Sequence, residues 1–268
     1  MDSTRELREK VFHDEWAKQT PVANIRVLDA FENITAQENR FIINRMGDLN
    51  RLRILDIGAG LGESAVYFAL RGARVTANDI SPAMLNQCLV LAKRFGVSID
   101  TYLSSSSEKF DFGENQFDIV YGANVLHHVG SIQPFLTAVK RALAPRGRFF
   151  FFDPLAYNPA INVYRLLATN VRTEDEQPLR FSDLKYFREL FSEVQHREFW
   201  LTTLLIFFKY FLLDRIDPNS ERYWKRILSE DSDRIGWWYK PLQRLDNVLL
   251  LLPPLQFMAW NIVIYGRK

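Results

Sequence analysis

The spacing of hydrophobic and polar residues divides this chain into stretches of different character. Residues 1–50 repeat apolar side chains at helical spacing, which predicts amphipathic helices. Residues 51–200 alternate short apolar runs with longer amphipathic ones, as in a parallel sheet covered by helices on both faces. Residues 201–257 break this rhythm, and residues 258–268 contain one more strand pattern. We therefore expect an N-terminal helical lid, an α/β core, a helical insertion and a last strand of the core sheet.

Seven short apolar segments have the length of buried strands, which predicts an α/β fold with a seven-stranded, mostly parallel sheet. The four phenylalanines from Phe149 to Phe152 fit a strand buried on both faces. Between two of the strands, Ser81 as N-cap and Pro82 as first helical residue predict a helix that ends near Phe95. The strands are expected to end at Asp56 and to cover residues 74–79, 99–103, 117–121, 148–152, 194–200 and 259–265.

The helices predicted within residues 2–48 are interrupted at Pro21 and end near Gly47. They are expected to form either a lid over the core or a collar that packs against it. One helical turn among them combines His13, Asp14, Glu15 and Trp16, and we interpret it as a solvated surface turn.

The insertion at residues 201–257 contains two long apolar runs, LTTLLIFFKYFLL and VLLLLPPL, separated by a polar and aromatic segment. Such runs predict a small hydrophobic core for a helical subdomain. An apolar substrate pocket, a dimer interface and a membrane-surface patch are the alternatives. The pattern alone does not choose among them.

Composition limits the classes of partner and compartment. A net charge of +2 does not favour nucleic acid as a partner. The single cysteine, Cys88, excludes an internal disulfide and lies in a helical pattern typical of a packed core thiol. No apolar run reaches the roughly 18–20 residues needed to span a bilayer, and the first ten residues lack a secretory signal. We expect a cytoplasmic protein, with peripheral membrane contact as one alternative.

The stretch from Ile54 to Leu70 has the character of a strand, a glycine-rich turn and a helix. Gly58, Gly60 and Gly62 would let the backbone approach a ligand closely, although any tight turn can also use glycine. An acidic residue, Asp79, ends the next strand about 20 residues later. Because an acid at this position can hold two ribose hydroxyls, the pair predicts a ligand that carries a ribose.

At this point the chain resembles a class I S-adenosylmethionine-dependent methyltransferase of the group that acts on small molecules and lipids. The resemblance rests on LDIGAGLGESAVYFA, VTANDISPAML, SSSSEKFDFGENQFDIVYGANVLHHV and LAPRGRFFFFD, which follow one another in the family's order. It covers roughly residues 35–155 and implies a Rossmann-like core.

The resemblance implies S-adenosyl-L-methionine as cofactor and S-adenosyl-L-homocysteine as product. Ser106 departs from the family, since many relatives have aspartate at that position. The residues implied to bind the cofactor are Asp56, Gly58 and Gly60 along its methionine part, Asp79 at the ribose, Ile80 and Met84 against the adenine, Ser106 and Ser107 at the adenine edge, and the backbone of Asn124 at the methionine end.

The same resemblance implies a general base for acceptor deprotonation, His127, helped by Asp153. A structural role for His127 is the alternative, since this His-His pair is common in the wider family. We expect His128 to pack or to orient its loop, and we find no partner for His13 or His196 and no metal-ligand spacing.

These observations favour methyl transfer by in-line displacement to the oxygen, nitrogen or carbon of a small, apolar or lipid-like acceptor. One alternative is an NAD(P)-binding oxidoreductase, whose fingerprint is GxGxxG. It is disfavoured because the glycines here are Gly58, Gly60 and Gly62, and Ser64 follows where that fingerprint would continue. Another is a domain that binds the cofactor without catalysis. A homodimer is an open alternative for the oligomeric state.

Overall fold

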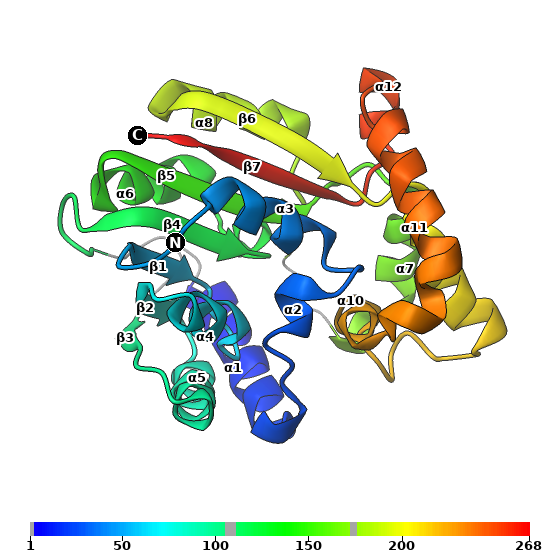
Figure 1. The fold of residues 1–268 in the computed structure, drawn as a ribbon, viewed down its shortest axis with the longest axis horizontal. Coiled ribbons are helices and arrows are strands. Elements are labelled where there is room, and N and C mark those ends of the chain that lie inside the picture. Colours follow the sequence, from blue (N-terminus) through cyan, green and yellow to red (C-terminus); the bar gives the residue numbers. More distant parts are fainter. Residues whose placement is uncertain (1–2, 105–110, 172–175) are drawn as a thin grey trace.

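The computed structural model describes residues 3–104, 111–171 and 176–268 (Figure 1). Its centre is a single seven-stranded sheet in the order β3-β2-β1-β4-β5-β7-β6. Only β7 pairs antiparallel with its neighbours, so the predicted mostly parallel sheet is confirmed. The strands are β1 Arg53–Ile57, β2 Arg74–Asp79, β3 Asp100–Leu103, β4 Phe117–Ala123, β5 Leu143–Pro154, β6 Ser192–Phe199 and β7 Asn261–Arg267.

Helices cover both faces of the sheet, as predicted. One face packs against α1 Ser3–Gln19, α2 Asp29–Glu32, α3 Gln37–Met46, α4 Glu63–Leu70 and α5 Pro82–Phe95. The other packs against α6 Ile132–Ala142 and α8 Leu184–Leu190. The α5 helix begins as predicted, because the Ser81 side chain accepts a hydrogen bond from the Met84 N–H.

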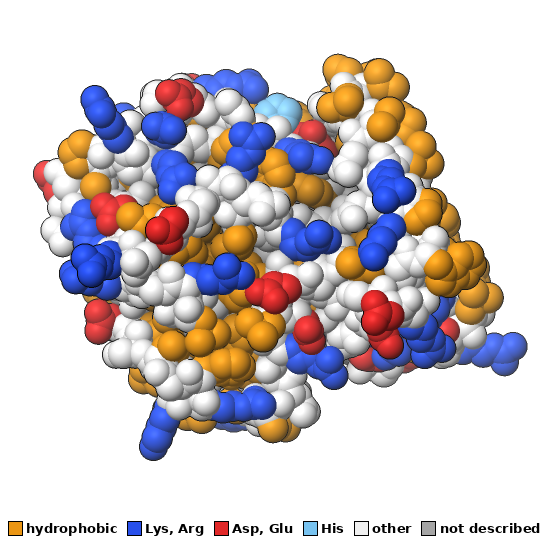
Figure 2. All heavy atoms as spheres, viewed as in Figure 1, with side chains coloured by type: hydrophobic (Ala, Val, Ile, Leu, Met, Phe, Trp, Pro, Cys, Tyr) orange, Lys and Arg blue, Asp and Glu red, His pale blue; other side chains and the backbone are white. Residues whose placement is uncertain are grey.

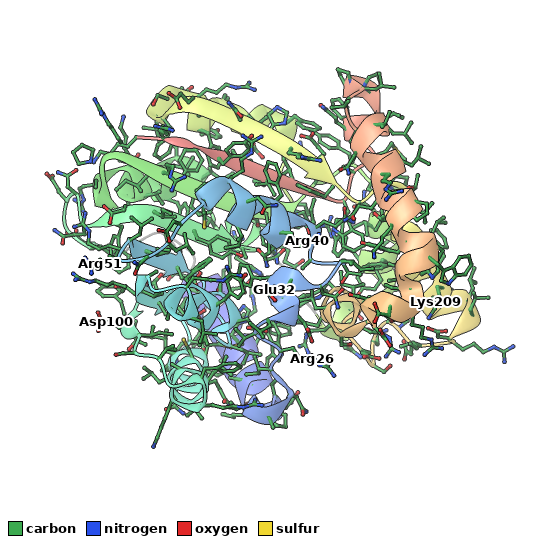
Figure 3. The ribbon with its side chains drawn as sticks, viewed as in Figure 1. Arg26, Glu32, Arg40, Arg51, Asp100 and Lys209 are labelled. Atoms are coloured by element: carbon green, nitrogen blue, oxygen red, sulfur yellow. The ribbon has the colours of Figure 1, made fainter. Side chains whose placement is uncertain are left out.

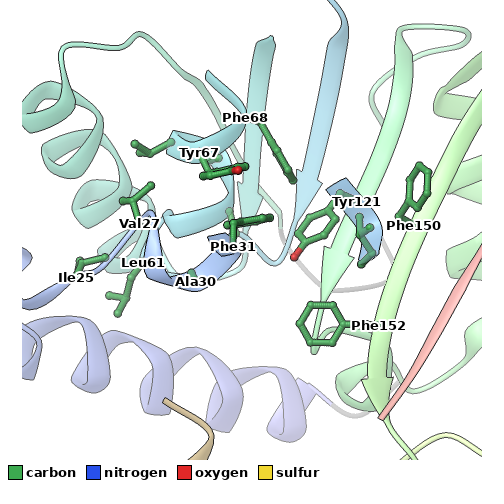
Figure 4. Packing of buried hydrophobic residues seen from close by; sticks show 14 of the residues in the cluster. Ile25, Val27, Ala30, Phe31, Leu61, Tyr67, Phe68, Tyr121, Phe150 and Phe152 are labelled. Atoms are coloured by element: carbon green, nitrogen blue, oxygen red, sulfur yellow. The ribbon is translucent and has the colours of Figure 1, made fainter. Parts of the chain in front are cut away.

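Alternating side chains of the phenylalanine run join the two hydrophobic cores. Phe150 and Phe152 belong to the core beneath α4 and α5, whereas Phe149 and Phe151 belong to the core beneath α6 and α8. Figure 4 shows the first of these cores, where Phe150, Phe152 and Tyr121 face rings from α2 and α4. The prediction of a strand buried on both faces is confirmed.

The helical insertion lies between β6 and β7, at the right of Figure 1. It consists of a 3-10 turn Thr202–Leu204, α9 Leu205–Phe208, a π-helical turn Lys209–Leu213, α10 Tyr223–Arg226, a 3-10 turn Ile227–Ser229, α11 Ser232–Leu249 and α12 Pro253–Gln256. Its core is aromatic and includes the buried Tyr210, Tyr223 and Tyr239. Another helix, α7 Pro159–Leu167, packs against it through Tyr164, whose ring contacts those of Phe207 and Tyr223. In the described part of the chain, no helix has both the length and the apolar character that crossing a membrane requires.

Several predicted boundaries were wrong. Strand β5 begins at Leu143 rather than at residue 148, because Leu143 already pairs with Phe117 before the register shifts. Strand β6 covers Ser192–Phe199 rather than residues 194–200, and β7 covers Asn261–Arg267 rather than residues 259–265. The helix α7, which the hydrophobic pattern did not reveal, is capped by the Asn158 side chain.

Candidate functional site

A cavity of about 710 Å³ lies beyond the carboxyl ends of the parallel strands. The helix α1 and the insertion both contribute to its wall. One side, here called the glycine side, is lined by Gly58, Gly60, Asp79 and Ile80 at the ends of β1 and β2. The other, here called the aromatic side, is lined by Glu38, Phe152, Tyr164, Trp200, Trp260 and Asn261, near the ends of β5, β6 and β7. In open α/β sheets, ligands bind at this edge of the sheet.

The glycine-rich turn has the backbone conformation that its sequence predicts. Gly58, Gly60 and Gly62 have φ values of 65°, 54° and 94°, all in the left-handed region that residues other than glycine rarely adopt. A Cβ atom at Gly62 would lie 2.7 Å from the Cys88 Sγ, so this glycine allows α4 to begin against α5. The turn also exposes the backbone of Gly58 and Gly60 to the cavity.

Asp79 is fixed at the end of β2 by backbone hydrogen bonds to both of its carboxyl oxygens. The Gly60 N–H donates to Oδ2 at 2.9 Å, and the Ser81 N–H donates to Oδ1 at 2.9 Å. Burial raises the pKa of Asp79, although it lines the cavity. A carboxylate oxygen can accept more than one hydrogen bond, so Asp79 can also accept bonds from a ligand's hydroxyls.

Asp56 lies beneath the cavity rather than in its wall. Its Oδ2 accepts a hydrogen bond from the Ser64 hydroxyl at 2.5 Å, and burial raises its pKa to about 8. The second oxygen, Oδ1, is buried and has no hydrogen-bond partner among the described residues. Ser64 lines the cavity itself, so Asp56 lies behind Ser64 rather than in the cavity wall.

The structure brings some of the other predicted residues together and separates others. Ile80 and Asn124 line the cavity, and Asn124 has a left-handed φ of 54° with its N–H bonded to the Phe152 carbonyl. Met84 does not line the cavity, because its side chain is fully buried in the core. Ser106 and Ser107 lie outside the described residues.

His127 and Asp153 form a buried pair at the carboxyl ends of β4 and β5. The distance between the His127 Nδ1 and the Asp153 Oδ1 is 2.7 Å, and the His127 N–H donates to the same oxygen at 3.1 Å. A carboxylate only accepts, so the proton of the imidazole lies on Nδ1 and leaves Nε2 as the basic atom. His127 lines the cavity, whereas Asp153 is fully buried behind it.

The contacts of α1 and β6 correct two predictions. In the His13-to-Trp16 turn only Glu15 is exposed, because Asp14 accepts a hydrogen bond from the Ser81 hydroxyl at 2.5 Å and Trp16 lines the cavity. His13 lies 3.4 Å from a Glu9 oxygen, and His196 lies 2.6 Å from a Glu198 oxygen, so both have the partners that the sequence did not reveal.

His128 also binds Glu9, at 2.9 Å, and burial lowers its pKa. Two groups of side chains that could bind a metal ion lie around His128. One is Glu9 with His13 and His128, and the other is His127 with His128 and Glu176. Hydrogen bonds and ion pairs account for the contacts of Glu9 with the two imidazoles, and we propose no metal there.

Sequence reasoning missed the polar groups of the aromatic side. Glu38, from α3, accepts hydrogen bonds from the Trp200 indole and the Asn261 amide. Burial raises the pKa of Glu38 to about 7. Glu38 lies more than 160 positions away from each of these two partners in the chain. The only local signal in the sequence was a glutamate in the first turn of an amphipathic helix.

Comparisons with known proteins bear on the glycine side. Residues 55–151 match the family model described as a methyltransferase domain. A ubiquinone biosynthesis O-methyltransferase of Rhizobium leguminosarum is 37% identical over 153 residues, covering 51% of this chain and 60% of that protein. One from Rickettsia akari is 32% identical over 145 residues, covering 52% of this chain and 54% of that protein.

Residues 55–151 thus form a methyltransferase domain within the α/β core. The chain spans a little over half the length of these curated relatives. Its fold is similar to that of a Haemonchus contortus phosphoethanolamine N-methyltransferase solved with S-adenosyl-L-methionine, with a TM-score of 0.57, 15% identity, and coverage of 96% of this chain and 60% of that one. This likeness shows a shared fold.

The glycine side of the cavity fits S-adenosyl-L-methionine. Asp79 offers two carboxylate oxygens for ribose hydroxyls, and the exposed backbone of Gly58 and Gly60 allows close approach of the methionine part. The unpartnered Asp56 Oδ1 is a further acceptor beneath this region. The comparisons give no support to the alternative of an oxidoreductase.

Proposed function

We propose that this protein transfers the methyl group of S-adenosyl-L-methionine to a small, apolar or lipid-like acceptor. One observation carries the proposal: the Asp79 cradle and the His127–Asp153 pair line or adjoin one cavity. The sulfonium supplies an activated methyl group, so the protein's main task is to align the acceptor with it. Alignment of this kind can lower a barrier by roughly 7–11 kcal/mol.

In this proposal, Asp79 and the backbone of Gly58 and Gly60 hold the cofactor on the glycine side, with Ile80 against the adenine. His127 accepts the acceptor's proton on Nε2 while Asp153 holds the proton on Nδ1 and stabilises the imidazolium that forms. The relatives named as ubiquinone biosynthesis O-methyltransferases support an oxygen acceptor on an apolar molecule.

We assign acceptor selection to the parts outside the core. Residues 1–50 act as a lid, since α1 places Glu9, Phe12, His13 and Trp16 in the cavity wall along one helical face. The insertion at residues 201–257 acts as a cap, because Trp224 and other residues of it line the cavity. The Trp224 ring packs edge-on against the Trp16 ring of α1, with centroids 5.5 Å apart.

Thermal-shift titration tests the cofactor assignment directly. We expect S-adenosyl-L-methionine and S-adenosyl-L-homocysteine to raise the melting temperature in a concentration-dependent way. NAD is the matched control, because it also carries an adenosine. Stabilisation by NAD alone would contradict the proposal.

A second part of the proposal concerns the outer surface of the insertion and α7. Here lie the four most exposed large apolar side chains of the described residues, at 74–79% exposure: Leu166, Leu213, Trp237 and Leu251. We define the apolar face as Val163, Leu166, Leu167, Leu205, Phe208, Phe211, Leu212, Leu213, Trp237, Leu245, Val248, Leu251, Leu252, Phe257 and Met258. Figure 2 shows hydrophobic atoms along this edge, over α11 and α12.

We assign the apolar face to peripheral contact with a membrane. Two cationic groups accompany it, since Lys240 and Arg244 are exposed on α11, at helical spacing from Trp237. A third, Lys209, lies at the outer edge of the insertion (Figure 3), where it pairs with Asp214. Such a mixture suits a surface of anionic lipid. The helix α7 connects the apolar face with the cavity. Its Ile161 and Tyr164 line the cavity, while its Val163 and Leu166 are exposed on the apolar face.

Vesicle flotation tests the membrane assignment. We expect the protein to float with vesicles that contain phosphatidylglycerol, and the paired changes Leu213→Ser and Trp237→Ser to abolish flotation. The matched control is Leu89→Ser with Val90→Ser, since both residues are exposed on α5, outside the apolar face. Absence of flotation, together with a dimer mass that the first pair of changes removes, would assign the apolar face to a homodimer instead.

A further inference from the structure

Glu38 is a buried carboxyl in the cavity wall that the proposed methyl transfer does not use. It is the second residue of α3, and its side chain lines the aromatic side of the cavity although it is only 6% exposed. Its hydrogen-bond donors come from the end of β6 and the start of β7. It therefore lies across the sheet from Asp79, which ends β2, because three strands, β1, β4 and β5, separate β2 from β7.

The partners of Glu38 leave its charge uncompensated. The Trp200 Nε1 donates at 2.8 Å and the Asn261 Nδ2 donates at 2.5 Å, both to Oε1. Neither partner is charged, and within the described residues no lysine or arginine forms an ion pair with Glu38. Its pKa of about 7, raised by burial, agrees with this environment.

Asn261 provides a second, independent observation. It lines the same part of the cavity and is 5% exposed. Its Oδ1 is buried and has no hydrogen-bond partner among the described residues. A buried acceptor without a donor is unfavourable, and structures rarely keep one unless a ligand or water completes it. Two hydrogen-bond acceptors, on Glu38 and Asn261, thus adjoin each other in a wall that is otherwise aromatic.

We propose that Glu38 and Asn261 recognise the methyl acceptor by binding a polar group that carries at least two N–H or O–H donors. A primary ammonium and a pair of neighbouring hydroxyls share this chemistry. The rings of Trp200 and Trp260, with centroids 5.5 Å apart, line the same side and suit an apolar body attached to that group. The inference rests on the proposed function and assigns the specificity of the acceptor to this pair.

Calorimetric titration of three probes tests the inference, with S-adenosyl-L-homocysteine saturating the glycine side. All three probes have a propylbenzene body: one has a terminal ammonium, one has two neighbouring ring hydroxyls, and one has no donor. We expect at least one donor-bearing probe to bind tenfold or more tightly than the donor-free probe. Glu38→Ala and Asn261→Leu should each remove this preference.

Glu38→Gln distinguishes the two donor groups. The neutral amide still accepts from hydroxyls, so binding of the diol should change less than threefold, whereas binding of the ammonium should fall at least tenfold. Glu198→Gln is the matched control, because it changes a buried carboxyl on β6 that does not line the cavity. It should leave the preference within twofold of the wild type.

Affinity for S-adenosyl-L-homocysteine serves as the check on folding in every variant. If that affinity is kept, equal binding of the three probes, or an unchanged preference in Glu38→Ala, overturns the inference. If Glu38→Ala fails this check, Glu38→Gln and Asn261→Leu decide the matter by the same criteria. Failure of the wild type to bind S-adenosyl-L-homocysteine would instead overturn the proposed function.

Discussion

The two sides of the cavity are built in different ways. The glycine side comes from a short stretch of sequence, since Gly58, Gly60 and Asp79 lie on two consecutive strand ends. The aromatic side brings together residues as far apart as Glu38 and Asn261, 223 positions apart in the chain. The part of an enzyme that binds a common cofactor can thus be local, while the part that selects the acceptor depends on the whole fold.

The largest expected effect concerns His127, the proposed base between the two sides. His127→Gln removes the basic Nε2 while keeping a polar side chain of similar size, so turnover should fall by about 10²–10⁴-fold. Initial rates of S-adenosyl-L-homocysteine formation measure this effect. His128→Gln is the matched control next to it and should retain most of the turnover. Equal losses in both variants would make His127 a structural residue.

The next effect tests the turn on the glycine side. Gly62→Ala combines a left-handed backbone with a Cβ that meets Cys88, so it should destabilise the fold by about 2–4 kcal/mol. Gly96→Ala is the control, because it also has a positive φ but meets no atom within 4 Å. It should cost about 1 kcal/mol. Urea unfolding measures both, and equal losses would show that close packing at Gly62 is unimportant.

A pH-dependent effect should distinguish the aromatic side. The folded-state pKa of Glu38, about 7, lies above its usual 4.5, so folding takes up a proton between these values and stability falls as pH rises through them. Glu38→Gln removes this loss. Its stability relative to the wild type should therefore increase from about pH 5 to about pH 8, by roughly 1–3 kcal/mol.

Melting temperatures across this range measure the difference for Glu38→Gln. Asp118→Asn provides a control of opposite sign, because its hydrogen bond from Arg53 holds the pKa of Asp118 below its usual value. That carboxyl stays ionised over the whole range, so the difference from the wild type should be flat. A flat result for Glu38→Gln as well would contradict the raised pKa.

The smallest effect concerns the lid over both sides. Asp14→Ala removes the hydrogen bond to Ser81 and should weaken the docking of α1 by about 1 kcal/mol. Hydrogen exchange of residues 3–19 should then become faster. Glu15→Ala is the control, since Glu15 is exposed and, among the residues that the structure describes, pairs with Lys18 alone, on the same helix. Unchanged exchange in Asp14→Ala would show that α1 is held by its apolar contacts alone.

The sequence predicted the parts of the structure that depend on neighbouring residues. The strand pattern, the Ser81 N-cap and the glycine turn all follow from short-range periodicity and backbone conformation. It did not predict that Asp14 docks on Ser81, because the two meet only after α1 packs against α5. Met84 illustrates the opposite error: family position implied a ligand contact, but the helical face of α5 turns this side chain into the core.

The separation of the two sides is the central claim, and calorimetric titration of S-adenosyl-L-homocysteine tests it most directly. Asp79→Ala should weaken binding at least tenfold, because it removes the carboxylate proposed to hold the ribose. Glu38→Ala should leave the affinity within twofold of the wild type, since Glu38 lies on the aromatic side. Unchanged binding in Asp79→Ala, or a tenfold loss in a folded Glu38→Ala protein, would contradict the claim.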